Sequence, residues 1–319
     1  MFYCLYKLKF LTPLHVGRDS GSAGLEGSQV YVHSDTFISA LYIESRKIGK
    51  ENDFYGAAED GKIAISSLFP YRGDELFLPK PIYAPRTDIT SVSPEKYKLF
   101  KKLQYIPLSM FGDYLRSLRG EGLFDAGRAH EQIKSVARVE TRTNVAIQHP
   151  KDNLPYYVGI TTFARDCGLY FIAGYGSEEE QEVTEQLIGQ LSCSGIGGKR
   201  SSGYGKFEIA KKALLDKEPG EPFCSLYSML SQRHNTYMSL NLSLAKDDEL
   251  DRAVEDGYFI LVRRGGFVES EKYSNRSLKK KLIYAFGEGS CFKYAYKGCI
   301  ADVSQGGRHP VYRFLKPFF

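Results

Sequence analysis

The feature that most constrains the chain is a glycine-rich stretch, 195–205, in which five positions are glycine. Glycine allows positive φ angles and a close approach of the backbone to a ligand, so successive N–H groups of such a stretch can point at one anion. The cations and hydroxyls between the glycines would add charge and hydrogen-bond donors. The sequence therefore predicts a phosphate-gripping loop made by Gly195, Gly197, Gly198, Lys199, Arg200, Ser201, Ser202, Gly203, Tyr204 and Gly205.

Spacing excludes the two best-known glycine-rich phosphate loops. A Walker A loop needs a glycine where Cys193 stands and a serine or threonine where Arg200 stands. A Rossmann fingerprint needs a third glycine, again at Arg200. Both loops also lead from a strand into a helix, whereas this one is expected to leave a helix and enter a strand. A flexible connection rich in glycine and serine is the alternative.

The elements on either side of the loop have clear signals. Ser177 and Glu180 predict a capping box at the start of the preceding helix, and Gly195 predicts its end. Residues 204–209 predict a short strand after the loop. The helix is expected to pack through one apolar stripe, which consists of Val183, Leu187, Ile188 and Leu191.

Length and repeated pattern predict two α+β units. A chain of 319 residues is long for one domain, and the charged run 216–222, with two prolines and a glycine, has the composition of a linker. Strand, helix and further strands follow one another on each side of it, which favours a split βαβ design. We therefore expect two ferredoxin-like (RRM-like) domains, 1–215 and 223–319, with the glycine-rich loop and a protruding β-hairpin in the first.

Four shorter patterns give local expectations. Apolar and polar residues alternate over 6–10 and over 238–244, which predicts two strands that each bury one face. Ser34 or Asp35 is expected to cap a helix. The segment 77–82 contains two prolines and is expected at a sheet edge or in a loop.

Residues 138–163 predict a long β-hairpin. Positions 139–147 carry β-branched residues on one face, with Arg142 and Asn144 among the polar residues on the other. The turn is expected at 149–153. The polar face is either solvated or leans on an RNA backbone.

Composition limits the function classes. The net charge of +5 comes entirely from residues 211–319, which hold 18 Lys+Arg against 13 Asp+Glu, and this fits a modest nucleic-acid or acidic-partner surface. The 6 cysteines and 6 histidines show neither C-x-x-C pairs nor zinc spacing, so we expect no metal, no cofactor and a reducing, cytoplasmic location. No apolar run is long enough to span a membrane.

Several segments resemble RAMP proteins of CRISPR systems. The glycine-rich loop resembles that superfamily in general. Further segments, in order along nearly the whole chain, resemble subunit four of the type III-A Csm effector complex: 12–17, 32–36, 77–81, 259–267, 309–313 and 316–319.

The resemblance implies a non-catalytic RNA-binding subunit. Its family has two ferredoxin-like domains, holds the 5′ handle of the crRNA, and contacts the large Cas subunit and the backbone RAMP subunit. It implies that residues 138–160 form the thumb hairpin that kinks the RNA. Besides the loop, the residues expected to contact RNA are His15, Gly17, Arg142, Arg263 and Arg264.

Two other functions stay open on the sequence alone. Some RAMP proteins are metal-independent endoribonucleases that process the crRNA precursor with a histidine, and His15 and His33 lie in the corresponding region. A loop aspartate cuts target RNA in the backbone subunit, which draws attention to Asp19, while Asp35 is better explained as a helix cap. The third possibility is an assembly subunit that binds only proteins.

Overall fold

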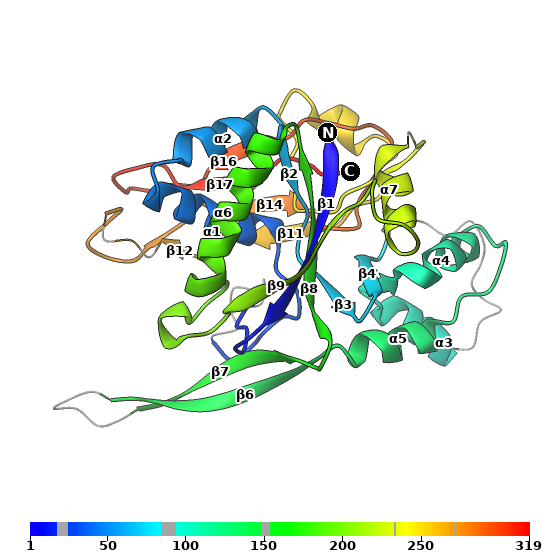
Figure 1. Ribbon diagram of the computed structural model, residues 1–319, viewed down its shortest axis with the longest axis horizontal. Coiled ribbons are helices and arrows are strands. Elements are labelled where there is room, and N and C mark those ends of the chain that lie inside the picture. The colour runs from blue at the N-terminus through cyan, green and yellow to red at the C-terminus, as the bar shows by residue number, and fades with distance from the viewer. Residues whose placement is uncertain (18–24, 84–93, 148–153, 233, 269, 271) are drawn as a thin grey trace.

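The structure is a computed structural model that describes residues 1–17, 25–83, 94–147, 154–232, 234–268, 270 and 272–319 (Figure 1). Its helices are α1 (Ser34–Lys47), α2 (Glu51–Glu59), α3 (Pro94–Lys102), the 3-10 turn η2 (Leu108–Met110), α4 (Phe111–Leu118), α5 (Ala126–Lys134), α6 (Glu178–Ser194), the 3-10 turn η3 (Arg200–Ser202), α7 (Phe223–Ser231) and α8 (Leu250–Val254). Its strands are β1 (Phe2–Phe10), β2 (Ile63–Ile65), β3 (Phe69–Arg72), β4 (Glu75–Pro79), β5 (Tyr105–Pro107), β6 (Ala137–Ala146), β7 (Leu154–Phe163), β8 (Cys167–Tyr175), β9 (Phe207–Leu214), β10 (Tyr237–Met238), β11 (Leu261–Arg264), β12 (Phe267–Val268), β13 (Leu278–Lys279), β14 (Ile283–Phe286), β15 (Cys291–Phe292), β16 (Cys299–Asp302) and β17 (Tyr312–Leu315).

An antiparallel sheet forms the centre of the molecule. Its strands lie in the order β5-β4-β3-β8-β1-β9, and β2 also pairs with β8. β1 is therefore an interior strand, with Leu5 opposite Ile172 on one side and Ala213 on the other. Helices α1, α2 and α6 cover one face of the sheet, and α3, α4, α5 and α7 lie on the other side (Figure 1).

The prediction that β1 buries only one face is wrong. Leu5 belongs to one apolar core and Tyr6 to the other, so both faces of the strand are covered. Lys7 is buried as well, because its ammonium donates a hydrogen bond of 2.7 Å to the Gly73 carbonyl and lies 3.4 Å from Asp74. A long aliphatic stem lets a lysine bury its carbons while its charge finds polar partners, so alternation with lysine does not prove a solvated face.

The segment 77–82 is only partly irregular: 77–79 end an interior strand, and 80–82 lie outside any strand. β4 lies between β3 and β5, and Phe77 and Leu78 are buried. Pro79 is tolerated because it is the last residue of the strand, where a missing N–H removes little of the ladder.

Helix α1 begins without the predicted side-chain cap. Its N-cap is His33, which makes no capping hydrogen bond. The Ser34 hydroxyl instead accepts a hydrogen bond of 3.0 Å from the Leu242 N–H, and Asp35 binds two arginines. Both side chains are used to attach the C-terminal part of the chain to α1.

Residues 223–319 form short strands paired two by two. The pairs are β10 with β15, β11 with β14, β12 with β13 and β16 with β17, and single bridges such as Ser243 to Phe286 link them. The long half-buried strand predicted over 238–244 is wrong, since only Tyr237–Met238 is assigned as strand and 239–243 is fully buried. That segment lies between the central sheet and the C-terminal tail, with Leu240 accepting from the Ser67 N–H and donating to the Phe318 carbonyl.

The predicted hairpin is present. β6 and β7 pair from Ala137 opposite Phe163 to Ala146 opposite Leu154, and the hairpin projects away from the sheet (Figure 1). Its β-branched face is exposed toward the tip, where Val145 is 56% accessible. The predicted turn, 149–153, lies outside the described residues.

Candidate nucleic-acid interface

The glycine-rich loop leaves α6 and enters β9, as expected. Gly195 ends the helix with φ 83°. Two details differ: the strand begins at Phe207 instead of residue 204, and the Ser177 hydroxyl donates to the Glu180 carboxylate instead of capping the helix backbone. The predicted apolar stripe is correct, with Leu187, Ile188 and Leu191 buried and Val183 packed beside them.

Three of the loop glycines are required by the loop's own folding. A Cβ at Gly205 would collide with the Ile196 carbonyl oxygen, one at Gly197 with the His15 carbonyl oxygen, and one at Gly195 would lie 2.5 Å from the Tyr204 oxygen. All three glycines have positive φ. The close approach predicted from the glycines therefore exists, but it is backbone against backbone inside the protein.

His15 packs against the glycine-rich loop and binds its backbone. Only 4% of the residue is exposed, its Nδ1 lies 2.6 Å from the Gly159 carbonyl oxygen, and its carbonyl accepts a 2.8 Å hydrogen bond from the Gly198 N–H. The ring also fills the space that a side chain at residue 198 would need. His15 is thus placed to hold Gly198 in position, and an RNA contact or proton transfer by its ring is not what this geometry favours.

Several loop N–H groups face no acceptor. Those of Gly198 and Gly205 bind residues 15 and 13, and those of 202–204 close the 3-10 turn. The N–H groups of Gly197, Lys199, Arg200 and Ser201 have no acceptor within the part of the chain that the structure describes. Lys199 has φ 59°, a left-handed conformation followed by right-handed residues, and successive N–H groups in such a turn form an anion-binding concavity.

Lys199 joins the loop to the hairpin. Its Nζ lies 4.6 Å from the centre of the Tyr156 ring and 3.4 Å from the Tyr156 hydroxyl. Tyr156 is directly opposite Asn144, and Arg142 lies two residues along the same strand, so all three share one face of the hairpin. Arg142 is about half exposed and lies 3.4 Å from Glu140. The structure therefore brings the loop and the predicted polar face of the hairpin together.

The two adjacent arginines of β11 point in opposite directions. Arg263 is exposed and lies opposite Tyr284 on β14. The Arg264 side chain is only 13% exposed, and its Nε and Nη2 donate to the two carboxylate oxygens of Asp35 at 3.0 and 2.9 Å. That both arginines contact RNA stays a prediction. Within the protein, Arg264 is paired with Asp35.

Asp35 is the centre of a buried ion-pair cluster. Arg313 binds it together with Arg264, and Thr36 donates to it at 3.3 Å. Burial by itself would raise the pKa of Asp35, but the charges of Arg264 and Arg313 outweigh that effect and hold the pKa well below its usual range. Sequence reasoning missed Arg313, because its partner lies 278 positions away and no local pattern connects them.

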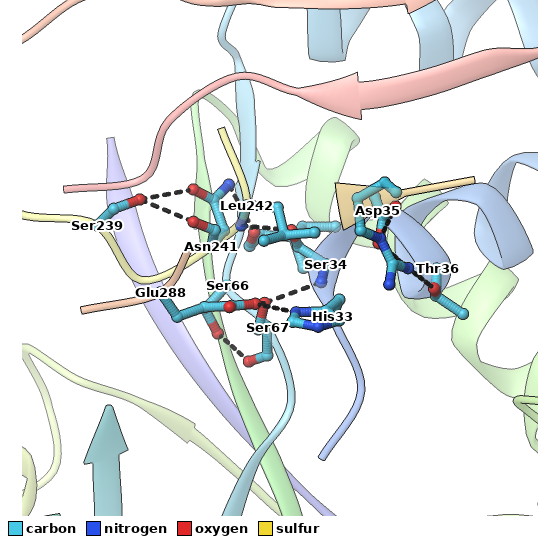
Figure 2. A network of polar contacts seen from close by, with 12 residues as sticks. His33, Ser34, Asp35, Thr36, Ser66, Ser67, Ser239, Asn241, Leu242 and Glu288 are labelled. Carbon is cyan, nitrogen blue, oxygen red and sulfur yellow. Dashed lines mark hydrogen bonds and ion pairs between the residues drawn. The ribbon is translucent and has the colours of Figure 1, made fainter. Parts of the chain in front are cut away.

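A second buried cluster lies beside the first (Figure 2). His33 Nδ1 is 2.7 Å from Glu288 Oε1, the Ser67 hydroxyl also donates to that oxygen, and the Ser34 N–H donates to the Ser67 hydroxyl at 2.8 Å. Burial opposes ionisation of Glu288, but the charge and hydrogen bond of His33 and the bond from Ser67 lower its pKa. His33 is 3% exposed, so it connects the start of α1 to the C-terminal part instead of facing a substrate.

The remaining predicted residues fall as follows. Gly17 is exposed, with nothing within 4 Å of the place of a Cβ. Asp19 lies outside the described residues. Across the described ranges no group of three or more His, Cys, Asp or Glu side chains is placed to hold a metal ion. None of the helices in the described ranges is both long and apolar enough to cross a membrane.

Comparison with known protein families gives matches on both sides of the predicted linker. A model of the RAMP superfamily matches residues 7–208, and a model of the CRISPR Csm4 C-terminal domain matches residues 232–319. The first match covers more than half of the chain, which defines the class as RAMP.

Curated relatives narrow the class further. A protein named "CRISPR system Cms protein Csm4" from Streptococcus thermophilus is 34% identical over 322 residues, with 98% of each chain covered. Its namesake from Mycobacterium tuberculosis (strain ATCC 25618 / H37Rv) is 33% identical over 301 residues, covering 94% of this chain and 92% of its own length. The chain therefore belongs to the Csm4 family of the RAMP superfamily, and the predicted resemblance is confirmed.

Solved structures share the fold. A chain in the crystal structure of the Csm3-Csm4 subcomplex in the type III-A CRISPR-Cas interference complex aligns with TM-score 0.63 and 18% identity, covering 99% of this chain and 98% of that one. A chain of the Csm1-Csm4 cassette in complex with cA4 aligns with TM-score 0.58, again at 18% identity, covering 99% and 96%. Mixed α/β architecture with antiparallel sheets is common to them.

Proposed function

We propose that this chain is a non-catalytic RNA-binding subunit of a type III-A CRISPR effector complex, which holds the 5′ handle of the crRNA and bridges the large Cas subunit to the backbone RAMP subunits. The observation that carries the RNA part is the set of N–H groups at 197 and 199–201 that have no acceptor among the described residues, together with the Lys199 ammonium of the same loop. The solved Csm4 structures were obtained with Csm3 and with Csm1, which supports the two protein partners.

The loop and hairpin together fit a single-stranded RNA. Backbone N–H groups and lysine bind phosphate without reading sequence, and phosphate contacts set the register of a nucleic acid on a protein. The hairpin then acts as the thumb. Its described distal part exposes Val145, Ile147 and Leu154, against which unstacked bases can rest. Cytoplasmic residence and contact through Arg142, Arg263 and Gly17 belong to the same proposal.

The strand order supports the domain assignment within this proposal. β9-β1-β8-β3, with α1 and α6 as crossing helices, is the order of a split βαβ unit, so we assign residues 1–215 to a first ferredoxin-like domain. Residues 223–319 would be the second, reduced to short paired strands. The boundary at 216–222 falls between the two family matches.

Burial of the histidines supports a binding role over a catalytic one. His15 and His33, which the endoribonuclease alternative needs, are 4% and 3% exposed and are hydrogen bonded inside the protein. A general acid or base must reach the proton that it transfers. The burial of both rings therefore supports the binding role.

Replacing both loop cations tests the proposal. We expect Lys199→Ala/Arg200→Ala to weaken binding of a repeat-derived RNA and to lower the slope of log affinity against log salt by about 1.4, since each phosphate contact on a single strand contributes about 0.7. Filter binding over a salt series measures both quantities, and the same samples on a denaturing gel should show intact RNA.

The matched control removes two exposed lysines elsewhere. Lys101→Ala/Lys102→Ala on α3 changes the net charge equally and should leave the salt slope nearly unchanged. Equal losses of RNA affinity in the two double variants would mean that the loop binds RNA no more specifically than any other positively charged surface of the chain. RNA cleavage that His33→Ala abolishes would make the chain an enzyme.

A further inference from the structure

A cationic cavity opens next to the glycine-rich loop. Its volume is about 240 Å³, and it lies between α1, the loop and the C-terminal part of the chain. The charged residues in its wall are Asp35, Arg200, Arg264, Lys280 and Arg313, and Thr36 adds a hydroxyl. The wall thus combines residues separated by more than two hundred positions.

The charges of this cavity do not balance. Asp35 is the single carboxylate among the described residues of the wall, and Arg264 and Arg313 already occupy both of its oxygens. Among the described residues no carboxylate lies within 4.0 Å of Arg200 or Lys280. Within the part of the chain that the structure describes, Arg200 and Lys280 therefore face the cavity without a carboxylate partner.

Lys280 is held in this unfavourable environment by the fold. Its backbone N–H donates to the Gly266 carbonyl at 2.9 Å, directly after β13. Burial, and next the charge of Arg313, lower the pKa of its ammonium, and Asp35 only partly opposes them. A half-buried cation with no carboxylate partner among the described residues costs stability, so its presence indicates an anion that the fold is prepared to receive.

The cavity suits a phosphate group. It is smaller than the roughly 300–1,000 Å³ of a pocket for a drug-sized ligand. The guanidinium of Arg200, the ammonium of Lys280 and the hydroxyl of Thr36 all line the cavity, and these are donors that phosphates commonly take. Gly197 and Arg200, whose N–H groups have no acceptor among the described residues, also line the cavity, so the cavity adjoins the proposed RNA path.

We propose that this cavity holds one phosphate group of the bound RNA, gripped jointly by Arg200 from the glycine-rich loop and Lys280 from the C-terminal part. The proposal rests on the proposed function for the identity of the ligand. RNA bound in this way links the two parts of the chain through a single phosphate. The Asp35 cluster orients Arg264 and Arg313 and keeps the cavity open.

The first test needs no RNA. Inorganic phosphate at millimolar concentration should raise the melting temperature of the full chain, since a ligand that binds only the folded state stabilises it. Lys280→Met, which keeps the stem and removes the charge, should lose most of this shift, and Lys281→Met at the exposed neighbouring position should retain it. A shift of equal size in all three proteins would overturn the site.

The second test uses RNA with a 5′-hydroxyl and with a 5′-phosphate. Lys280→Met should weaken binding roughly tenfold, as for loss of one charged hydrogen bond, and Lys280→Arg should recover most of it. Equal weakening of both RNAs assigns the site to an internal phosphodiester, and weakening of the 5′-phosphorylated RNA alone assigns it to the terminus.

The two proposals fail differently. Normal RNA binding by Lys280→Met, with the loop variant still defective, would overturn the phosphate cavity and leave the proposed function intact. A wild-type chain that responds to phosphate but binds no RNA would overturn the proposed function and the RNA source of the phosphate.

Lys280→Met should melt no lower than wild type in the absence of phosphate, because the change removes a repulsion.

Discussion

Gly205→Ala is expected to destabilise the folded chain by about 4 kcal/mol, at the upper end of what single substitutions do. Two effects add. The residue has φ 74°, which costs an alanine about 1–2 kcal/mol. The new Cβ would also collide with the Ile196 carbonyl oxygen. Ile196 cannot easily move away, because its N–H donates a hydrogen bond to the Gly205 carbonyl. The free energy of unfolding from urea titration measures the loss.

Gly203→Ala is the matched control. Gly203 has φ 83°, close to the φ of Gly205, but none of the described residues lies within 4 Å of the place of its Cβ. We expect it to lose only the cost of the left-handed conformation, about 1–2 kcal/mol. Similar losses at both positions would show that backbone conformation alone, without the collision, determines what the loop tolerates.

The sequence predicted those elements whose signals are local. The apolar stripe of α6, its end at Gly195 and the hairpin over 138–163 were all correct to within a few residues, because helix and strand periods repeat over short distances. The glycine-rich loop was also found. What the sequence could not tell is that Gly195, Gly197 and Gly205 are needed to pack the loop against residues 13–15 and against itself.

The sequence did not predict roles that depend on distant partners. The position of Asp35 before an apolar run predicts a helix cap. Its actual partners are Arg264 and Arg313, which lie 229 and 278 positions away in the sequence. His33 and Glu288 are likewise 255 positions apart. The local pattern predicts exposed faces for Lys7 and for the segment 238–244. Lys7 and residues 239–243 are buried, because segments from elsewhere in the chain cover them. Only the tertiary structure brings these groups together.

The joined clusters explain why the start of α1 carries so many polar residues. His33, Ser34 and Asp35 each bind a different segment of the C-terminal part, at Glu288, Leu242 and the two arginines. Buried polar contacts of this kind fix geometry more than they add stability. They hold the C-terminal wall of the phosphate cavity against the loop that forms its other wall.

Asp35→Asn is therefore expected to have a large effect, a loss of about 3–5 kcal/mol in the free energy of unfolding. Asparagine has the same shape, so packing is preserved, but two guanidinium groups with side chains 13% and 7% exposed lose their ion pairs with the Asp35 carboxylate. Asp53→Asn, at an exposed position 3.4 Å from Lys50, removes the same charge and should change stability by less than about 0.5 kcal/mol.

A double-mutant cycle and the pH dependence make this prediction specific. Arg313→Met should cost less in the Asp35→Asn background than alone, because the guanidinium has then already lost its ion pair with Asp35. Since the folded pKa of Asp35 lies below its ordinary value of 3.8, the ionised carboxylate stabilises the fold fully above that pH and loses this contribution as pH falls toward the folded pKa. The stability difference between wild type and Asp35→Asn should therefore be constant around neutral pH and shrink only in strong acid. Additive losses in the cycle, or a difference that already disappears near pH 6, would mean that Asp35 does not hold the two arginines as a buried anion.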